Sequence, residues 1–139
     1  MHCSFVDTFC CQITDGFFIY SEGFNHSSLL LAPELSLSGP PAARCLSFWY
    51  FSFGNVASSN VFRVYTGREQ VYSRPEWSRR KLRRGVWTKG AVHIGHRLSP
   101  LQVVFAIEFG EVFGGLALDD ISVVDGPCDA CMLALDSLL

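Results

Sequence analysis

The sequence predicts an all-β fold, a two-sheet antiparallel β-sandwich of the jelly-roll type. Apolar residues alternate with polar ones in several short runs, turn residues separate these runs, and no long apolar repeat with helical spacing precedes the last residues. Alternation is clearest in residues 101–109, whose apolar face comprises Leu101, Val103, Phe105, Ile107 and Phe109. About seven or eight such strands are typical of a sandwich.

Three strands are expected in the first part of the chain. Residues 17–20 form a short apolar run, and residues 29–31 are a second candidate. Residues 46–53, with the sequence LSFWYFSF, carry aromatic side chains at both odd and even positions. A strand that is apolar on both faces is typical of a central position in a sheet, so we expect this segment to be a central strand.

The later part of the chain offers further strands. Residues 61–66 and 70–73 predict a short hairpin around the turn at Gly67. Residues 86–94 form another strand region, which we expect to be broken at Gly90 because glycine weakens the interior of a strand. Clusters of Gly, Pro, Ser and Asn lie between these runs and mark the turns.

The run GGLALDDISVV, residues 114–124, places two aspartates side by side in an apolar strand. With a strict period of two, Asp119 and Asp120 point to opposite faces, and Asp120 shares its face with Leu116, Leu118 and Val124. An aspartate near the core needs backbone N–H groups, an arginine or a cation, because burying an unpaired charge is costly. Neighbouring strand residues cannot converge on one substrate atom, so the pair is not catalytic.

The length of 139 residues fits one domain, and 12 Phe, 4 Tyr and 3 Trp can fill a core. A chain of this size buries roughly two-thirds of its unfolded surface, which makes disorder unexpected. No apolar stretch reaches the length of about 18 residues that a membrane span needs. Residues 1–12 lack the basic start and apolar core of a signal peptide, so we expect an excerpt of a larger secreted protein or an incomplete sequence.

The chain has six cysteines, many for a domain with a large core: Cys3, Cys10, Cys11, Cys45, Cys128 and Cys131. The last two form a CxxC motif, but the chain has no second CxxC, and the adjacent pair at positions 10 and 11 offers poor geometry for zinc. We therefore favour disulfides over zinc or free thiols. Disulfides indicate an oxidising compartment, and the sequon at Asn25 agrees with secretion and predicts a glycosylation site.

Charge is distributed unevenly along the chain. All 11 Lys and Arg residues lie between positions 44 and 97, where the net charge is +9, whereas residues 1–43 carry −4 and residues 98–139 carry −7. This asymmetry favours a surface with two differently charged faces over a uniform nucleic-acid binder, and nucleic acid is not an expected partner.

Five cations fall within six residues of this middle segment: Arg79, Arg80, Lys81, Arg83 and Arg84. This basic patch is a candidate site for heparan sulfate or an acidic protein, and a candidate processing site for basic-specific proteases. A solvated loop between two strands is the alternative. Trp77 and Trp87 flank the run as an aromatic rim that can stack on arginine or sugar, with an anchoring role in the core as the alternative.

Patterns for catalysis and metal binding are weak. The sequence contains no Ser-His-Asp arrangement, phosphate-binding loop or HExxH motif, and nothing positions a carboxylate pair for glycoside hydrolysis. His93 and His96 lie three positions apart and face opposite sides of a strand, so shared ligation of a metal needs a turn at Gly95. The sequence therefore favours a domain that is not an enzyme.

A series of motifs follows along the chain: Cys3-Ser-Phe5, Leu29-Leu-Leu-Ala-Pro33, Cys45-Leu-Ser-Phe-Trp-Tyr-Phe-Ser-Phe-Gly54, Trp87, Gln102-Val-Val-Phe105, Gly115-Leu-Ala-Leu-Asp-Asp-Ile-Ser122 and Gly126-Pro-Cys128. In order and spacing they resemble the MAM domain, the extracellular module of meprins, neuropilins and receptor tyrosine phosphatases. The motif that begins at Gly115 is closest to the family signature. The resemblance implies a MAM-like β-sandwich over residues 1–128 and a tail or linker over residues 129–139.

The resemblance also implies two disulfides, one between Cys45 and Cys128 and one between Cys3 and either Cys10 or Cys11. In the chain-entropy model, a link across the 83 positions between Cys45 and Cys128 stabilises the fold by at most about 4.5 kcal/mol. Two cysteines are then left over, and they pair with each other, stay free or bond another chain.

The chain departs from the family pattern near its start. Phe5 is followed by Val-Asp where the family has Phe-Glu, and about twenty-five residues around an acidic, Trp-containing strand are absent before residue 17. An early strand is therefore expected to be missing or rearranged. Some MAM domains bind a structural cation, for which Asp7, Asp119 and Asp120 are candidate ligands. Calcium needs six to eight oxygens, so a backbone or arginine partner for the aspartates is favoured, and no other cofactor is expected.

For function, the resemblance implies a non-catalytic adhesion or protein-interaction module of a secreted or membrane-anchored protein, outside the cell or at its surface. Its expected partners are other extracellular or cell-surface proteins, including further copies, contacted through edge strands and exposed aromatics. The alternative is a glycan-binding jelly roll that uses residues 79–84 for sulfated chains of the heparan sulfate kind. Salt separates the two, since binding of a sulfated glycan weakens steeply with ionic strength.

Overall fold

The computed structural model describes residues 9–13, 16–23, 25, 27–31, 43–54, 60–67, 74–94, 102–111 and 113–129. This part of the chain contains no helix, and hence none long and apolar enough to cross a membrane. Its strands, in chain order, are β1 (Phe9–Ile13), β2 (Gly16–Gly23), β3 (Ser27–Leu31), β4 (Arg44–Gly54), β5 (Val61–Gly67), β6 (Trp77–Arg79), β7 (Thr88–Ile94), β8 (Gln102–Glu108) and β9 (Gly114–Asp125).

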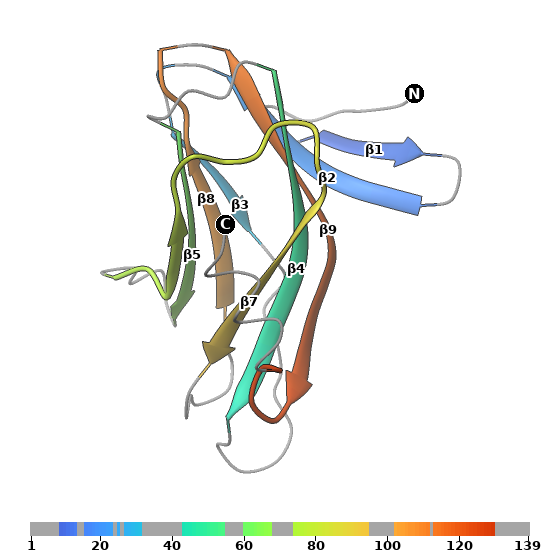
Figure 1. Cartoon of the computed structure of the whole chain (residues 1–139), viewed down its shortest axis with the longest axis vertical. Coiled ribbons are helices and arrows are strands. Elements are labelled where there is room, and N and C mark those ends of the chain that lie inside the picture. Colours follow the sequence, from blue (N-terminus) through green and yellow to red (C-terminus); the bar gives the residue numbers. More distant parts are fainter. Residues whose placement is uncertain are drawn as a thin grey trace.

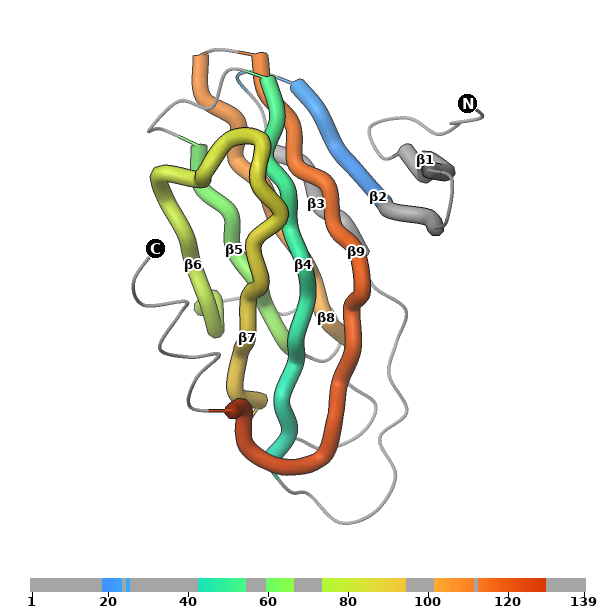
Figure 2. The backbone as a smooth tube through the Cα atoms, turned by 45° about the vertical axis from the view of Figure 1, so that its right-hand side comes forward, coloured from blue at the N-terminus to red at the C-terminus, as the bar shows by residue number. Residues whose placement is uncertain are grey.

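The strands form two antiparallel sheets that face each other across the core (Figure 1). The five-stranded sheet has the order β1-β2-β9-β4-β7, and the four-stranded sheet has the order β3-β8-β5-β6. In the turned view, the five-stranded sheet lies in front of the other (Figure 2). The arrangement confirms the all-β, two-sheet antiparallel fold, and β4, with a strand on each side, is central as its sequence predicts.

Two strands differ from the expectation. The sequence does not predict β1, which pairs with β2 and forms an edge of the five-stranded sheet. β5 pairs with β6 and β8, whereas the predicted hairpin partner at residues 70–73 lies outside the described residues. β6 has only three residues, Trp-Ser-Arg, so it offers no alternation from which a strand can be predicted.

Aromatic rings form the centre of the core. The Phe48 ring packs edge to face against Phe62, Trp77 and Phe105, with centroids 5.8, 5.4 and 5.2 Å away. Edge-to-face contact at such separations is a favoured geometry for aromatic pairs. The apolar face predicted for β8 is confirmed within the described residues, because the same cluster contains Val103, Phe105, Ile107 and Phe109.

Gly90 does not break β7, contrary to the prediction. The strand is continuous, and Gly90 pairs with Phe48 of β4. A Cβ atom at this position would overlap ring carbons of Phe48. The glycine therefore allows the large ring to lie close to the backbone, which is a common reason for glycine inside a strand.

β9 contains a β-bulge at the paired aspartates. The register with β4 shifts there, so that two residues, Asp120 and Ile121, lie opposite the single residue Phe48. Asp120 has a φ of 47°, a left-handed conformation that Asp adopts more readily than most residues. The Asp119 carboxylate accepts a hydrogen bond of 2.8 Å from the backbone N–H of Asp120. The bulge thus accounts for the adjacent carboxylates in an apolar strand.

The bulge also shows that the predicted phase of this strand is wrong. One extra residue reverses the alternation, so Val123 packs against the core whereas Val124 is 55 % exposed. A strict period of two instead predicts Val124 and Asp120 on the face of the buried residues Leu116 and Leu118. Asp120 is exposed, so it needs no buried partner.

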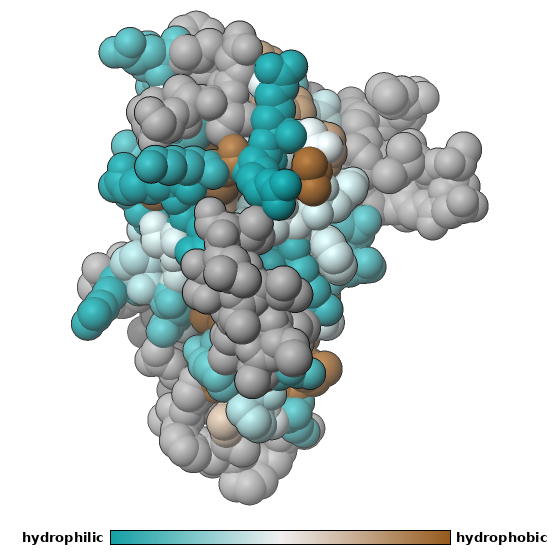
Figure 3. Space-filling view, viewed as in Figure 1, coloured by the Kyte–Doolittle hydropathy of each residue, from teal (hydrophilic) through white to brown (hydrophobic). Residues whose placement is uncertain are grey.

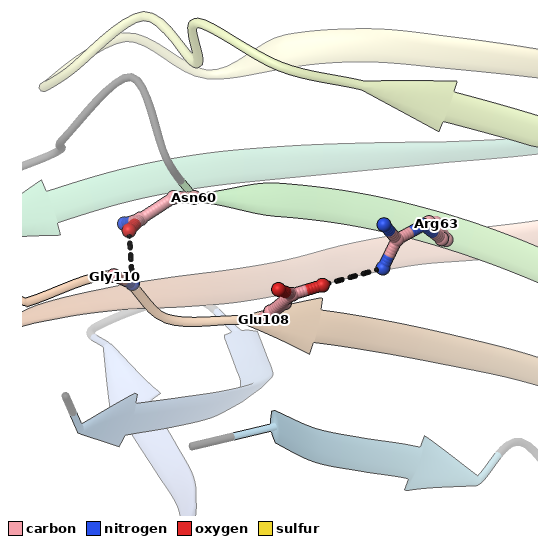
Figure 4. A network of polar contacts seen from close by, with 4 residues as sticks. All are labelled: Asn60, Arg63, Glu108 and Gly110. Atoms are coloured by element: carbon pink, nitrogen blue, oxygen red, sulfur yellow. Dashed lines mark hydrogen bonds and ion pairs between the residues drawn. The ribbon is translucent and has the colours of Figure 1, made fainter. Parts of the chain in front are cut away.

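Polar contacts join β5 to β8 in the four-stranded sheet (Figure 4). The backbone N–H of Gly110 donates to Oδ1 of the buried Asn60 at 2.7 Å. Arg63 forms an ion pair of 2.9 Å with Glu108. The contact with Gly110 gives the buried Asn60 side chain a hydrogen-bond partner, as stable folds require. The ion pair with Glu108 neutralises Arg63, one of the cations of the basic middle segment.

Cys45 of β4 forms a disulfide with Cys128, which is the pairing implied by the MAM resemblance. Both residues are buried and pack with Ala91 of β7 in a small cluster apart from the main core. Nearby, the buried Arg44 forms an ion pair of 3.1 Å with Asp125 at the end of β9. These contacts hold the segment after β9 against the start of β4.

Candidate functional site

The basic run at residues 79–84, here called the basic crossing, passes from one sheet to the other and is anchored on the way. It leaves β6, turns at Lys81 with a φ of 53°, and continues past Leu82, which is buried in the core. The backbone N–H of Gly85 then donates to the carbonyl of Ser52 on β4 at 2.8 Å. Figure 2 shows the segment reaching the upper part of β4 before it enters β7.

Most cations of the basic crossing point into solvent: Arg80, Lys81, Arg83 and Arg84 are exposed. Within the part of the chain that the structure describes, none of these four forms an ion pair, whereas Arg44 and Arg63 each have a carboxylate partner. Arg79 is half-buried, and its guanidinium lies 5.3 Å from the centroid of the Trp77 ring. Cations held close together on an anchored backbone produce a positive surface that attracts anions.

Trp77 does not belong to an aromatic rim, and the structure instead bears out the alternative, an anchoring role in the core, together with the expected contact with an arginine, Arg79. Its side chain is 9 % exposed and lies in the core, with ring centroids 5.4 Å from Phe48, 5.7 Å from Tyr50 and 5.1 Å from Phe62. β6 is the edge strand of the four-stranded sheet, and its alternation turns Trp77 inward while Ser78 is exposed. Trp87 is half-buried instead, and its ring lies 5.3 Å from that of Phe51.

Trp87 borders a row of aromatic side chains on the outer face of the five-stranded sheet. Since Phe48 and Tyr50 of β4 point into the core, the alternation of the strand places its other aromatic residues on the outside. These are half-buried, and together with Trp87 we call them the outer aromatic strip: Trp49, Phe51 and Phe53.

Neighbouring strands complete the surroundings of the strip. Nζ of Lys89 on β7 lies 5.8 Å from the centroid of Trp49. Tyr20 on β2 packs edge to face on Phe53 at 5.9 Å, and burial raises the pKa of Tyr20, to which the carboxylate of Glu22 adds. A Cβ atom at Gly115 would overlap several ring carbons of Phe53, so this ring lies against the backbone of β9.

The basic crossing and the outer aromatic strip are neighbours. Arg84 forms a parallel bridge with Ser52, the residue between Phe51 and Phe53. Val86, two residues after the crossing, is 44 % exposed, which adds apolar surface at this end of the sheet. In the space-filling view, hydrophilic teal atoms gather over the upper part of the molecule, and hydrophobic brown atoms lie beside them (Figure 3).

The predicted metal ligands do not come together within the described residues. This part of the chain holds no group of three or more His, Cys, Asp or Glu side chains that could bind a metal ion. Asp119 accepts a backbone hydrogen bond, Asp120 and His93 are exposed, and Asp7 and His96 lie outside the described residues. The donors that are described do not fit the oxygen shell of calcium, and the calcium site remains a prediction.

The remaining candidate residues are only partly described. Cys10 and Cys11 lie on β1, but their side chains, like the whole of Cys3 and Cys131, lie outside the described residues, so the second disulfide stays a prediction. Asn25 is exposed in the turn between β2 and β3, with a φ of 51°, and its backbone N–H donates to Gly110 at 2.9 Å. Its exposure is compatible with glycosylation, which also stays a prediction.

Reasoning from sequence missed the outer aromatic strip. The signal is present, because aromatic residues occupy positions 49, 51 and 53 as well as 48 and 50. A strand that is apolar on both sides predicts burial on both sides, whereas a two-layer sandwich covers only the inner face. The partial exposure of the outer row follows from the number of layers, which composition does not reveal.

A family model described as the MAM domain, meprin/A5/mu, matches residues 4–129. The chain belongs to the MAM family. The match spans all strands of both sheets, and it confirms the resemblance seen in the motifs. The basic crossing and the outer aromatic strip both lie within the matched residues of this MAM domain.

Curated relatives are longer proteins of which this MAM domain matches a part. Neuropilin-1 from Gallus gallus is 28 % identical over 111 residues, which are 78 % of this chain and 12 % of the relative. MAM domain-containing glycosylphosphatidylinositol anchor protein 2 from Homo sapiens is 28 % identical over 127 residues, 82 % of this chain and 13 % of the relative. The chain therefore spans about one-eighth of the length of these relatives.

Solved structures share the fold at low sequence identity. TmCBM61 in complex with β-1,4-galactotriose has a TM-score of 0.58 and 14 % identity, over 86 % of this MAM domain and 83 % of that chain. The K3 cleaved adhesin domain of Lys-gingipain from Porphyromonas gingivalis has a TM-score of 0.57 and 20 % identity, over 79 % and 74 % of the two chains. These likenesses establish the fold alone.

Proposed function

We propose that this MAM domain is a non-catalytic interaction module of an extracellular or cell-surface protein, and that it acts by binding other proteins. Membership of the MAM family carries the proposal. The name of one relative includes a glycosylphosphatidylinositol anchor, which supports a place at the cell surface. The disulfide between Cys45 and Cys128 supports the same location, since disulfides persist in oxidising compartments.

The surface offers residue types that dominate protein interfaces. Aromatic residues and arginine are enriched at the centres of such interfaces, and this MAM domain presents both at one end of the five-stranded sheet. Proteins on neighbouring cells and further copies of the same module are the partners proposed.

The proposal is tested with the tagged chain, secreted behind a foreign signal peptide and coupled as a tetramer to raise avidity. The tetramer is applied to living cells that are untreated, treated with protease, or treated with an enzyme that removes heparan sulfate. Protein binding predicts loss of the signal after protease and retention after glycan removal. Binding that survives the protease contradicts the proposal, and tetramers of an unrelated β-sandwich serve as the control.

Glycan binding is a second candidate, favoured by the basic crossing. Its four exposed cations have no carboxylate partner among the described residues, and its backbone is anchored at Leu82 and Gly85, so little ordering is needed on binding. A related fold holds a galactose oligosaccharide in TmCBM61, which is compatible with this candidate.

Heparin affinity tests this candidate. The variant R80A/K81N/R83A/R84A removes the exposed cations, and Asn is used at position 81 because its φ is positive. We expect the variant to leave a heparin column at distinctly lower salt, because attraction between exposed charges is screened and scales with their number. Arg74→Ala removes an exposed cation outside the crossing and is the control. If the parent and the quadruple variant elute at the same salt concentration, glycan binding through the basic crossing is ruled out.

A further inference from the structure

We infer that the basic crossing and the outer aromatic strip form one site for a sulfated saccharide, which stacks a sugar ring on Phe51 and Trp87 while its sulfates contact the crossing. The inference rests on the glycan-binding candidate above and adds an apolar half to that site. It also assigns a role to side chains that the protein does not need in its core.

The two halves are continuous along β4. The bridge between Arg84 and Ser52 brings the end of the basic crossing beside Phe51 and Phe53. From there the strip runs along the strand to Trp49, a length of about 13 Å at 3.3 Å for each residue. At that end Lys89 contributes another cation over the Trp49 ring. A short chain lying along β4 therefore meets positive charge at both ends and aromatic rings between them.

Charge also differs between the two sides of the strip. Arg84 and Lys89 lie toward β7, whereas Asp119 and Glu22 lie on β9 and β2, on the other side. Glu22 pairs with Gly115, the residue beneath Phe53, and Asp119 pairs with Trp49. This surface therefore suits a ligand that carries anionic groups on the side that faces β7 and hydrogen-bond donors on the side that faces β9.

A sulfated saccharide has this combination of groups. Its sulfates complement the cations, its hydroxyls can donate to carboxylates, and the C–H face of a sugar ring packs on an aromatic ring. An acidic polypeptide such as polyglutamate offers carboxylates for the cations but no sugar ring with a C–H face to pack on Phe51 and Trp87.

The test measures binding of a heparin hexasaccharide to the secreted chain, with the desulfated hexasaccharide and polyglutamate as comparison ligands. Phe51→Leu and Trp87→Leu remove rings without removing charge. We expect each to lower the affinity for the hexasaccharide about three- to tenfold, which is the range of a lost aromatic contact. Tyr65→Leu removes a half-buried ring from β5 of the other sheet and is the matched control.

Trp87→Phe provides a second readout, because it keeps a ring for stacking and removes the indole. We expect the hexasaccharide to shift the tryptophan emission of the parent, and the shift to be smaller in Trp87→Phe, which keeps Trp49 of the strip, while affinity changes less than twofold. Circular dichroism of each variant identifies any loss of fold, and Trp87→Phe alone still tests the site if Trp87→Leu does not fold.

The outcomes separate this inference from the candidate on which it rests. Loss of binding in the quadruple crossing variant together with unchanged affinity in Phe51→Leu and Trp87→Leu overturns the composite site and leaves a purely electrostatic one. Unchanged binding in the quadruple variant overturns both. Equal affinity for polyglutamate and the hexasaccharide, with no effect of the ring variants on either, identifies a general polyanion surface and also overturns the inference.

Discussion

The two faces of β4 carry the same kind of side chain in different surroundings. On the inner face, Phe48 and Tyr50 are at most 3 % exposed and contact rings from the opposite sheet. On the outer face, Trp49, Phe51 and Phe53 are half-buried, with neighbours from their own sheet and from the segment that leads into β7. One row closes the core, whereas the other stays partly exposed to solvent.

The contrast teaches that aromatic content indicates a central strand but not the role of each ring. A ring enclosed on all sides contributes burial and close packing to stability. A ring on an open face retains apolar area that is partly in water, and that area can still be removed from water by a ligand. Stability and binding should therefore respond separately to changes at neighbouring positions of one strand.

The largest expected difference is between Phe48→Ala and Phe51→Ala. Phe48→Ala leaves a cavity among Phe62, Trp77 and Phe105, and we expect a loss of about 3–5 kcal/mol in the free energy of unfolding. Phe51→Ala removes a half-exposed ring, and we expect a loss of about 1 kcal/mol. Urea denaturation of both variants measures the difference, and equal losses would show that the outer row is as important to the fold as the inner one.

A second comparison uses glycines that lie under rings on opposite faces. Gly90→Ala pushes a methyl group into the enclosed Phe48 ring, and we expect a destabilisation of about 1–3 kcal/mol. Gly115→Ala meets Phe53 in the same way, but that ring can turn toward solvent, so we expect a change below about 1 kcal/mol. Thermal unfolding of the two variants measures both losses of stability. A larger loss for Gly115→Ala than for Gly90→Ala would contradict this expectation.

The bulge in β9 determines which residues beyond it belong to each face, and Asp120 is its left-handed residue. Asp120→Val places a β-branched side chain at a φ of 47°, and we expect a loss of about 1–2 kcal/mol. Asp120→Gly removes the same carboxylate without the steric cost, and we expect a change within about 0.5 kcal/mol. If both variants lose equal stability in urea, the carboxylate matters here and the backbone conformation does not.

These residues also show how much the sequence predicts. The apolar face of β8 follows from alternation, and the central place of β4 follows from apolar residues on both of its faces; both are local properties of the chain. The bulge depends on the register between β4 and β9, and the burial of Trp77 depends on a three-residue strand that closes a sheet edge. The outer aromatic strip depends on the absence of a third layer over β4 among the described elements. All three features depend on tertiary structure. The basic run could therefore be predicted from the sequence, whereas the aromatic residues beside it were expected at Trp77 and are found in the outer aromatic strip.

The smallest expected effect concerns Tyr20, at the edge of the outer aromatic strip. Burial and the Glu22 carboxylate raise the pKa of Tyr20 above its usual value of 10.0. As the pH rises past that value, the unfolded chain loses the phenol proton before the folded protein does. The folded state then holds more protons, so its stability falls with rising pH. Below the usual pKa both states keep the phenol proton, and the full stability is present.

Tyr20→Phe removes this group, so above pH 10 the variant should lose stability less steeply than the parent. Urea denaturation at several pH values measures the two slopes, and phenolate absorbance of the folded protein reports the titration directly. Parallel slopes would show that the outer face leaves Tyr20 as well hydrated as it is in the unfolded chain. That result would weaken the view of this face as a surface already partly withdrawn from water, on which a sugar ring can settle with little further desolvation.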